Sequence, residues 1–359
     1  MGRVPGTLLA GARGAAGRPR GAGRQGQRRP GDPRLCCEGH RAQQCGGPAR
    51  LPGTAIGELG WRRLLREHLV FEAHSSYALG VLFTPDGQTL VSAGMDSLIK
   101  LWSVPEWQPI KTLQGHENSV NSLSLSPDGK TLASGSTDAT VRLWSLPDGR
   151  LLHTLRDRKK TVSAVRIARD GCHVAAGSYG GRAVVWTLDG EEVSAIAASK
   201  KNLSAVDFLD GNVLATGGLG GQVLLWALPS GEPLISLPAH EIAVLTLRAL
   251  DGGRTLASLG YEGSARFWDT KTWDEVGCLQ LSPGGAGTPA VRGMVFSPDE
   301  KTAAVALEGK VQLWSVEEAA LVEELPVSTR AVNGLAFSPD GRWLVAGAAD
   351  GKIRVWERT

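Results

Sequence analysis

The chain has 359 residues, of which 42% are hydrophobic and 6% aromatic, and its formal net charge is +3. This apolar content is too high for a wholly disordered chain and sufficient for a full core. No uninterrupted apolar run approaches the roughly 18 residues that a transmembrane helix requires, so we expect no membrane span.

Residues 1–50 form a basic segment that differs from the rest of the chain. They contain ten Arg, no Lys and two acidic residues, for a net charge of +8, whereas residues 51–359 carry −5. Gly, Ala, Pro and Arg fill 34 of these 50 positions. Such a segment cannot bury enough apolar surface to offset its conformational entropy. We therefore predict that residues 1–60 are a disordered extension.

This extension allows more than one interpretation. An Arg/Gly-rich arm could bind nucleic acid through phosphate contacts. A stretch without a selected function has the same composition when its codons are GC-rich, and we favour that interpretation. Four potential zinc ligands lie here, but they lack the C-x₂-C spacing of a tetrahedral site, so we predict no metal. They are Cys36, Cys37, His40 and Cys45.

From about residue 66 the chain repeats with a period near 42 residues. Each unit has three apolar-alternating segments separated by turns, the third ending in Trp, and then a loop and a fourth segment. In the second unit the strands are expected at 120–125, 131–136, 140–144 and 151–155. The seven tryptophans, at spacings of 42, 42, 40, 42, 46 and 42, are Trp102, Trp144, Trp186, Trp226, Trp268, Trp314 and Trp356.

Four turns between the first and second strands share a Pro-Asp motif. They begin at Thr84, Ser126, Ser297 and Ser338. Pro presets φ, Asp bonds back to the backbone, and Gly at the fourth position, where present, supplies a positive φ. Four short antiparallel strands per unit, repeated seven times, predict an all-β seven-bladed β-propeller over residues 61–359.

These motifs resemble the WD-repeat (tryptophan–aspartate repeat) β-propeller family over about residues 64–359. Among the seven blade tryptophans only Trp268 is followed by Asp. The resemblance implies that a strand near residues 64–71 completes the last unit, which ends three residues after its Trp. The regular motifs resemble bacterial members of the family. The fullest pattern is Gly115-His116, Ser126-Pro-Asp-Gly129, Leu132-Ala-Ser-Gly135, Asp138 and Val141-Arg-Leu-Trp144.

A set of His, Ser, Asp and Trp recurs with spacings of 18, 4 and 6 residues. A catalytic nucleophile occurs once per site, whereas this set repeats with the unit, so we expect no hydrolase triad and no enzyme. The family resemblance implies instead a buried hydrogen-bond network from Asp through His and Ser to the indole N–H. Its members are His74, Ser92, Asp96 and Trp102, then His116, Ser134, Asp138 and Trp144, and finally His240, Ser258 and Trp268, with Glu262 in the Asp position.

No other motif indicates catalysis or a cofactor. The sequence lacks a phosphate-binding loop, an H-E-x-x-H motif and a dinucleotide-binding turn. The five Cys are an odd number spread from Cys36 to Cys278, which is not a disulfide framework. A reducing compartment follows, and we expect the protein in the cytoplasm.

Candidate partner-binding residues precede the turn Asp position between the second and third strands. In the resembled family this loop opens on one face around the channel. Six of the seven residues are apolar or aromatic, where solvated loops are normally polar. Tyr77 is expected on the same face, so all three Tyr map to one rim. The seven are Met95, Thr137, Tyr179, Leu219, Tyr261, Leu307 and Ala349.

Basic residues adjoin this rim. We therefore predict a non-catalytic scaffold, a monomeric propeller within a larger complex, that binds acidic or aromatic-compatible peptide segments of protein partners. Two alternatives are a nucleic-acid-associated adaptor and a merely solvated loop. Trp107 and Trp273 are expected to cover blade edges on the opposite face, where a second interaction site could form. The basic residues are Arg156, Arg158, Lys159, Lys160, Lys200 and Lys201.

Overall fold

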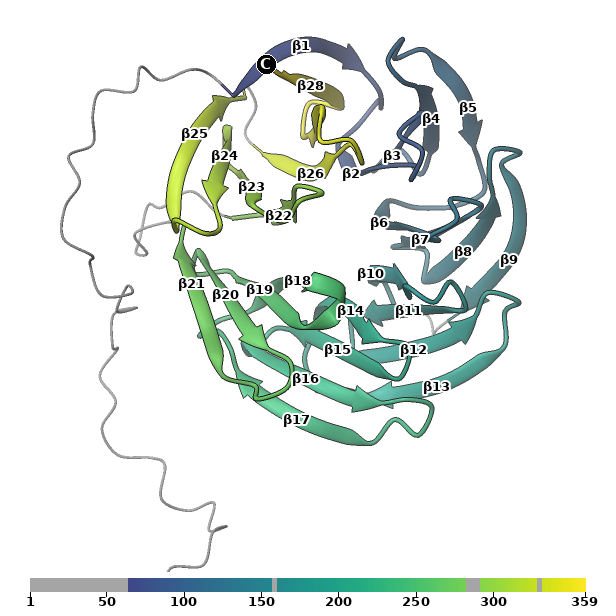
Figure 1. Ribbon diagram of the computed structural model, residues 1–359. Coiled ribbons are helices and arrows are strands. Elements are labelled where there is room, and N and C mark those ends of the chain that lie inside the picture. Colours follow the sequence, from purple (N-terminus) through teal and green to yellow (C-terminus); the bar gives the residue numbers. More distant parts are fainter. Residues whose placement is uncertain (1–63, 157–159, 282–290, 328–330) are drawn as a thin grey trace, which may run out of the picture. The chain divides into compact units, whose positions relative to one another are not determined.

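The computed structural model describes residues 64–156, 160–281, 291–327 and 331–359. In this part of the chain 28 strands form seven four-stranded antiparallel sheets, which are arranged as blades around a common centre (Figure 1). The predicted seven-bladed β-propeller is confirmed. The expected disordered extension, the four potential zinc ligands and the residues Arg158 and Lys159 lie outside the described residues. No helix in the described ranges is long and apolar enough to cross a membrane.

The first three blades run in chain order from the innermost to the outermost strand. Blade 1 contains β2 (Ala78–Phe83), β3 (Thr89–Gly94), β4 (Ile99–Ser103) and β5 (Pro109–Leu113). Blade 2 contains β6 (Val120–Leu125), β7 (Thr131–Ser136), β8 (Thr140–Ser145) and β9 (Arg150–Arg156). Blade 3 contains β10 (Val162–Ile167), β11 (His173–Ser178), β12 (Arg182–Thr187) and β13 (Glu192–Ala197).

The next three blades follow the same order. Blade 4 contains β14 (Leu203–Asp210), β15 (Val213–Gly218), β16 (Gln222–Ala227) and β17 (Pro233–Pro238). Blade 5 contains β18 (Val244–Leu250), β19 (Thr255–Gly260), β20 (Ser264–Asp269) and β21 (Glu275–Gln280), with the short 3₁₀ helix η1 (Asp251–Gly253) after β18. Blade 6 contains β22 (Gly293–Phe296), β23 (Thr302–Leu307), β24 (Lys310–Ser315) and β25 (Ala320–Pro326).

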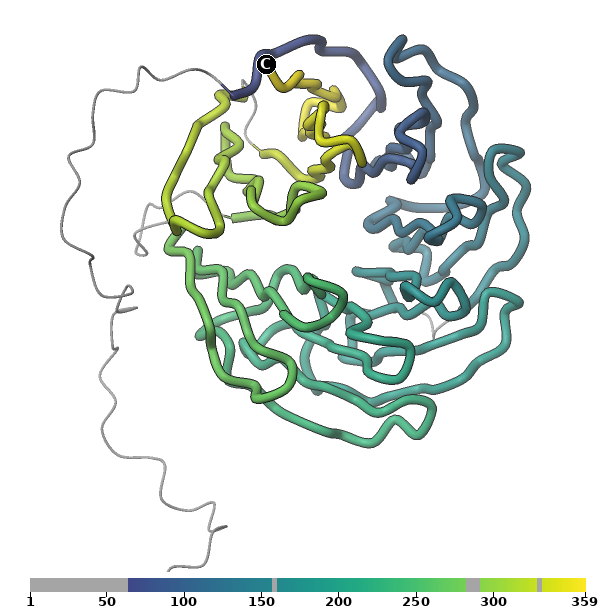
Figure 2. Tube along the Cα trace, in the orientation of Figure 1, coloured from purple at the N-terminus to yellow at the C-terminus, as the bar shows by residue number. Residues whose placement is uncertain are grey.

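Blade 7 combines the two ends of the repeat region. Its inner strands are β26 (Val332–Phe337), β27 (Trp343–Ala348) and β28 (Lys352–Arg358), and its outer strand is β1 (Leu65–Glu72). β1 pairs antiparallel with β28, from Leu65 opposite Arg358 to Glu72 opposite Lys352. Figure 2 shows this junction as the purple start of the propeller beside the yellow end.

The core lies between neighbouring blades. The cluster between blades 1 and 2 joins Val91, Ile99 and Leu101 to Leu132 and Trp144. β3 and β7, which carry Val91 and Leu132, are buried at five consecutive positions, because both faces of these strands pack against neighbouring blades. Because each blade buries both faces against its neighbours, the ring depends on every interblade contact.

The Pro-Asp turns are held by their own side chains. In blade 2 the Ser126 hydroxyl donates to Asp128 Oδ1 at 2.6 Å, and the Lys130 N–H donates to the same oxygen at 3.0 Å. These hydrogen bonds lower the pKa of Asp128. Gly129 adopts a φ of 73°, which glycine tolerates without strain. We call the end of the propeller that carries these turns the lower end, and the opposite end the upper end.

Removing β1 should open the ring. A chain without residues 1–72 leaves β28 as an unpaired edge and exposes the apolar surface that Leu65 covers, so we expect aggregation and loss of cooperative thermal unfolding. A chain without residues 1–55 keeps β1 and should melt within about two degrees of the full chain. Equal melting temperatures for both truncations would contradict closure by β1.

Candidate functional site

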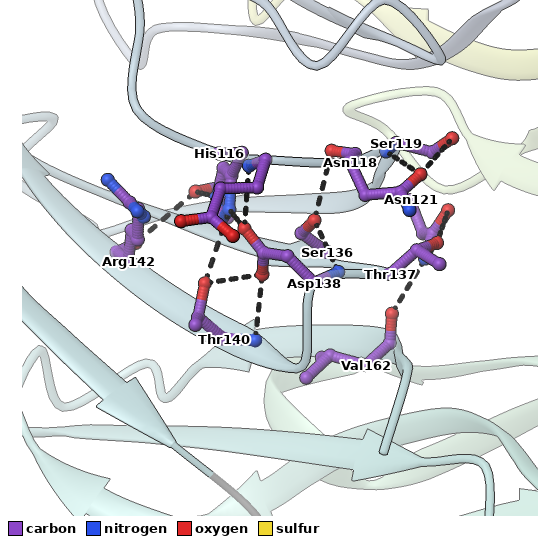
Figure 3. A network of polar contacts seen from close by, with 12 residues as sticks. His116, Asn118, Ser119, Asn121, Ser136, Thr137, Asp138, Thr140, Arg142 and Val162 are labelled. Atoms are coloured by element: carbon purple, nitrogen blue, oxygen red, sulfur yellow. Dashed lines mark hydrogen bonds and ion pairs between the residues drawn. The ribbon is translucent and has the colours of Figure 1, made fainter. Parts of the chain in front are cut away.

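The His–Ser–Asp–Trp set of blade 2 forms one chain of hydrogen bonds at the upper end. Figure 3 shows its His116 and Asp138 together with Thr140. His116 Nδ1 lies 2.8 Å from Asp138 Oδ2, and His116 Nε2 lies 2.7 Å from Ser134 Oγ. The Trp144 indole N–H donates to Ser134 Oγ at 2.9 Å. The Thr140 hydroxyl adds a bond of 2.6 Å to Asp138 Oδ1. The loop before β6, the loop before β8 and the strand ending in Trp144 are thus tied together.

Blades 1 and 5 contain the same arrangement. In both blades the His Nε2 lies 2.9 Å from the Ser Oγ, to which the indole N–H also donates. The carboxylate partner is Asp96 at 2.9 Å in blade 1 and the longer Glu262 at 2.5 Å in blade 5. The three carboxylates therefore anchor the same loop in three blades.

Burial and hydrogen bonding decide how the network titrates. Desolvation lowers the pKa of His74 and His116 below the ordinary 6.5, so both rings are neutral at pH 7. Burial acts to raise the pKa of Asp138, but hydrogen bonds from Thr140, His116 and the Glu117 N–H outweigh it and lower this pKa to about 2. A neutral imidazole between a carboxylate and a hydroxyl satisfies His116, Asp138 and Ser134 in blade 2.

The serines of this network are not placed to attack a substrate. Ser92, Ser134 and Ser258 each have 0% exposure. Each hydroxyl already contacts an imidazole and an indole. The arrangement fixes loops, which is the role that the family resemblance implies.

Other blades hold their tryptophan differently. In blade 4 the Trp226 indole N–H donates to the Thr216 hydroxyl at 2.9 Å, and in blade 6 the Trp314 indole N–H donates to Gln312 Oε1 at 3.1 Å. Blades 3 and 4 have Gly180 and Gly220 in the Asp position, with φ of 132° and 111°. These substitutions leave the upper ends of blades 3 and 4 without the carboxylate anchor.

An apolar pocket of about 340 Å³ opens at the upper end across blades 3, 4 and 5. Tyr179, Leu219 and Tyr261 line it with Ile242, and each of the four side chains is about half exposed. The pocket is therefore made of large apolar side chains that solvent reaches. Its other lining residues are Asn202, Leu203, Ser204, Ala243 and Leu245.

Backbone hydrogen bonds hold these pocket walls in place. The Gly220 N–H donates to the Ile242 carbonyl at 2.8 Å, which links blades 4 and 5. The Tyr261 N–H donates to the Ala243 carbonyl and the Tyr179 N–H to the Thr161 carbonyl, both at 2.9 Å. The pocket is thus built on tied loops, which reduces the ordering cost of binding.

Lysine stems flank the pocket. An added Cβ on Gly180 would lie 3.6 Å from Lys160 Cγ, and one on Gly220 would lie 3.5 Å from Lys201 Nζ. Lys160, Lys200 and Lys201 are exposed. Glu241, next to Ile242, is an exposed acidic residue beside the same pocket.

Two of the expected rim residues lie in another part of the ring. Tyr77 and Met95 are exposed by 46% and 44% in blade 1, where the Met95 N–H donates to the Tyr77 carbonyl at 2.9 Å. Neither lines the apolar pocket. Thr137 is half-buried and accepts a hydrogen bond from the Asn121 amide at 3.0 Å, and Ala349 is half-buried in blade 7. The structure thus brings together Tyr179, Tyr261 and Leu219 without Tyr77.

Leu307 is a correction to the sequence-based expectation. It is the last residue of β23, is 1% exposed, and packs in the core cluster with Leu279 and Met294. The reason is that the hairpin of blade 6 is one residue shorter, so that Leu307 pairs with Lys310 across a two-residue turn. Counting back from Trp314 therefore misplaced Leu307 in the loop. Comparing residues 302–314 with 131–144 of blade 2 reveals the missing residue.

Trp107 is also not available as a second interaction surface. It is 4% exposed and packs against Trp343 of blade 7, with ring centroids 5.4 Å apart. Trp273 is half-buried against the cluster between blades 4 and 5. Ile242 is the large exposed pocket residue that sequence reasoning missed, because it lies in the loop before a first strand and not in the compared loop.

The comparisons with known proteins show that the chain carries WD40 repeats. The family model described as "WD domain, G-beta repeat" matches residues 65–103, 107–145, 149–187 and 320–357, which together are less than half of the chain.

Within the described residues no group of three or more His, Cys, Asp and Glu side chains could hold a metal ion.

Three relatives are similar to parts of this chain. Autophagy-related protein 16 of Arabidopsis thaliana is 23% identical over 41% of this chain and 29% of its own length. WD repeat-containing protein 36 of Homo sapiens is 31% identical over 33% of this chain and 13% of its own length. Small ribosomal subunit protein RACK1y of Oryza sativa is 26% identical over 40% of this chain and 43% of its own length. The chain thus spans less than half the length of these relatives. All three are eukaryotic and give no support to the expected bacterial resemblance.

Replacing Asp138 by Ala should destabilise blade 2. The change leaves buried His116 without its carboxylate, and we expect a loss of about 1–3 kcal/mol in the free energy of unfolding. Urea unfolding measures this loss. Asp148→Ala is the control, since Asp148 is an exposed loop residue of the same blade. Gly180→Ala is not a suitable control at the equivalent turn position of blade 3, because the φ of 132° at Gly180 makes alanine there strained. Equal unfolding curves for both Asp variants would contradict the network.

The buried histidines should make stability fall in acid. Because the folded-state pKa of His74 and His116 lies below 6.5, the unfolded chain binds protons first as the pH falls. The free energy of unfolding should be largest above pH 6.5 and decrease as the pH falls through the mildly acidic range below 6.5. Urea unfolding across this range should show a shallower decrease for His116→Asn than for the wild type. An unchanged slope in the variant would oppose a neutral buried His116.

Proposed function

We propose that this chain is a protein-interaction scaffold whose upper end holds an acidic peptide segment with an apolar anchor residue. The observation that carries this proposal is the pocket of about 340 Å³ formed by Tyr179, Leu219, Ile242 and Tyr261. Pockets of this size, with large apolar walls, accept a single side chain or a short turn of a partner. In this proposal the propeller acts as one copy within a larger complex in the cytoplasm.

The composition of the pocket supports a protein partner. Tyr is enriched among interface residues whose truncation costs most, because its ring buries a large area with few rotatable bonds. Two of the three Tyr of the chain line this pocket. A desolvated aromatic anchor in such a pocket gains both apolar burial and edge or face contacts with the rings.

The charges around the pocket favour an acidic segment. Lys160 and Lys201 lie beside Gly180 and Gly220 at its edge, and Lys200 is exposed next to them. Glu241 offsets one of these three charges. Exposed rim charges act mainly on the association rate and on its salt dependence, whereas the apolar centre determines how long the complex lasts.

One of the relatives belongs to a larger assembly, which is compatible with this proposal. The rice relative is, by its name, a protein of the small ribosomal subunit, and therefore part of a larger complex. That property belongs to the relative, which shares 26% identity over less than half of each chain. It supports a scaffold role here only at the level of the shared repeats.

Truncating the two tyrosines of the pocket should strongly weaken peptide binding. We expect random peptides displayed on phage to be enriched for segments with acidic residues around an aromatic or aliphatic anchor. Binding of a selected peptide, measured by titration calorimetry, should lose at least about 2 kcal/mol in the variant Tyr179→Ala with Tyr261→Ala. Its melting temperature should stay close to that of the wild type, because both rings are about half exposed.

Tyr77→Ala is the matched control. Tyr77 has a similar exposure at the same end but lies outside the pocket, so its loss should leave the affinity unchanged. Lys200→Gln with Lys201→Gln should slow association at low salt and have little effect at high salt. Full affinity in the double Tyr variant would oppose the proposed pocket. Steeply salt-dependent RNA binding without peptide binding would favour the nucleic-acid alternative.

A further inference from the structure

The innermost strands of blades 3, 4 and 5 place three charged residues in one row of the central channel. Arg166, Asp207 and Arg248 occupy equivalent positions, opposite Ala175, Ala215 and Ala257 of the second strands. Strands β10, β14 and β18, which carry them, lie next to one another around the centre in Figure 1. The equivalent positions of the other four blades hold uncharged residues, namely Leu82, Ser124, Val295 and Ala336.

These residues face a cavity of about 470 Å³ at the lower end of the channel. Residues from all seven blades line it, and the Pro-Asp turn of blade 6 contributes Ser297, Pro298 and Glu300. Arg169, in the turn after β10, adds a third guanidinium. The cavity is thus separate from the apolar pocket, which opens at the upper end.

The carboxylate in this row already has hydrogen-bond and ion-pair partners within the protein. Asp207 accepts hydrogen bonds from the Phe208 and Ala249 N–H groups, both at 3.0 Å, and lies 3.4 Å from Arg166 Nε. Glu300 at the rim accepts the Asp251 N–H at 2.8 Å. Asp207 thus offsets part of the positive charge of Arg166 and Arg248, and its oxygens are also used by two backbone N–H groups.

The guanidinium donors are not all satisfied. Arg169 donates to the Ala249 carbonyl at 2.5 Å. Arg248 has no hydrogen bond or ion pair with any described residue, and the buried Arg166 Nε lacks a hydrogen-bond partner there. Desolvation and the charges of Arg166 and Arg169 lower the pKa of Arg248 to about 10, so it is still a cation at pH 7. Three arginines oppose two carboxylates in this cavity.

We propose that the lower end of the channel binds a small phosphate-bearing anion between Arg166 and Arg248, with Arg169 at its edge. A guanidinium presents a planar fork of donors that matches two oxygens of a phosphate group. A tetrahedral anion also offers oxygens in several directions, so it can meet donors from blades 3 and 5 together. A carboxylate ligand would offer only two coplanar oxygens, so it is less suited than a phosphate group to donors that come from two blades. The cavity volume is within the range of small-molecule sites.

Titration calorimetry of the full chain with inorganic pyrophosphate tests this proposal. We expect one binding site per chain, weaker binding of inorganic phosphate, and still weaker binding of sulfate at matched ionic strength. Arg248→Gln should weaken pyrophosphate binding by roughly ten-fold or more, because it removes a charge-assisted fork. Arg254→Gln is the control, since Arg254 is an exposed residue of the lower end outside the cavity.

Two further variants separate binding from folding. Asp207→Asn removes the competing carboxylate and should tighten pyrophosphate binding, which a general loss of structure would not do. Arg248→Lys keeps the charge without the fork and should also bind more weakly than the wild type. Absence of pyrophosphate binding, or equal affinity in the wild type and a folded Arg248→Gln or Arg248→Lys chain, would overturn the proposal.

Discussion

The antiparallel pairing of β1 with β28 is the constraint on which the rest of this structure depends. Each blade buries both of its faces, so the first and last blades must also meet. The cluster that joins them packs Val81 and Trp102 of blade 1 against Val345 and Val355 of blade 7. β1 belongs to blade 7 by its hydrogen bonds, yet the chain continues from it directly into blade 1. β1 therefore closes the ring, because one covalent segment joins the sheet of blade 7 to that of blade 1.

The same junction positions the hydrogen-bond networks at the upper end. The His74 N–H donates to the Gly351 carbonyl of blade 7 at 2.9 Å, while the His74 ring bonds to Asp96 of blade 1. Blades 2 and 5 repeat this ring contact with His116 and His240. Blades 3 and 4 have glycine in the carboxylate position, and there lysine stems and the side chains of Tyr179 and Leu219 shape the surface. The apolar pocket thus includes the two blades in which glycine replaces the carboxylate of the repeat.

The fold could be predicted from the sequence because each unit repeats the same pattern of alternating apolar residues and turn residues. The expected strands 120–125 and 131–136 agree with β6 and β7 to the residue. The candidate surface was recovered only in part. Aligning units gives a residue's place within its blade, but not which blades share a pocket, so Tyr77 was grouped with Tyr179. The expectation for Leu307 was wrong because a residue is missing between it and Trp314, so that counting back from the tryptophan reaches the strand and not the loop.

The two sites inferred here lie on the same three blades, at opposite ends. Blades 3, 4 and 5 carry the apolar pocket above and Arg166, Asp207 and Arg248 below. The equivalent inner positions of blades 1 and 2 hold Leu82 and Ser124, which need no counter-ion. A charged inner row costs stability unless something neutralises it, since like guanidinium charges repel in a desolvated channel. Asp207 offsets part of this repulsion, and the proposed phosphate-bearing anion would offset the positive charge that remains.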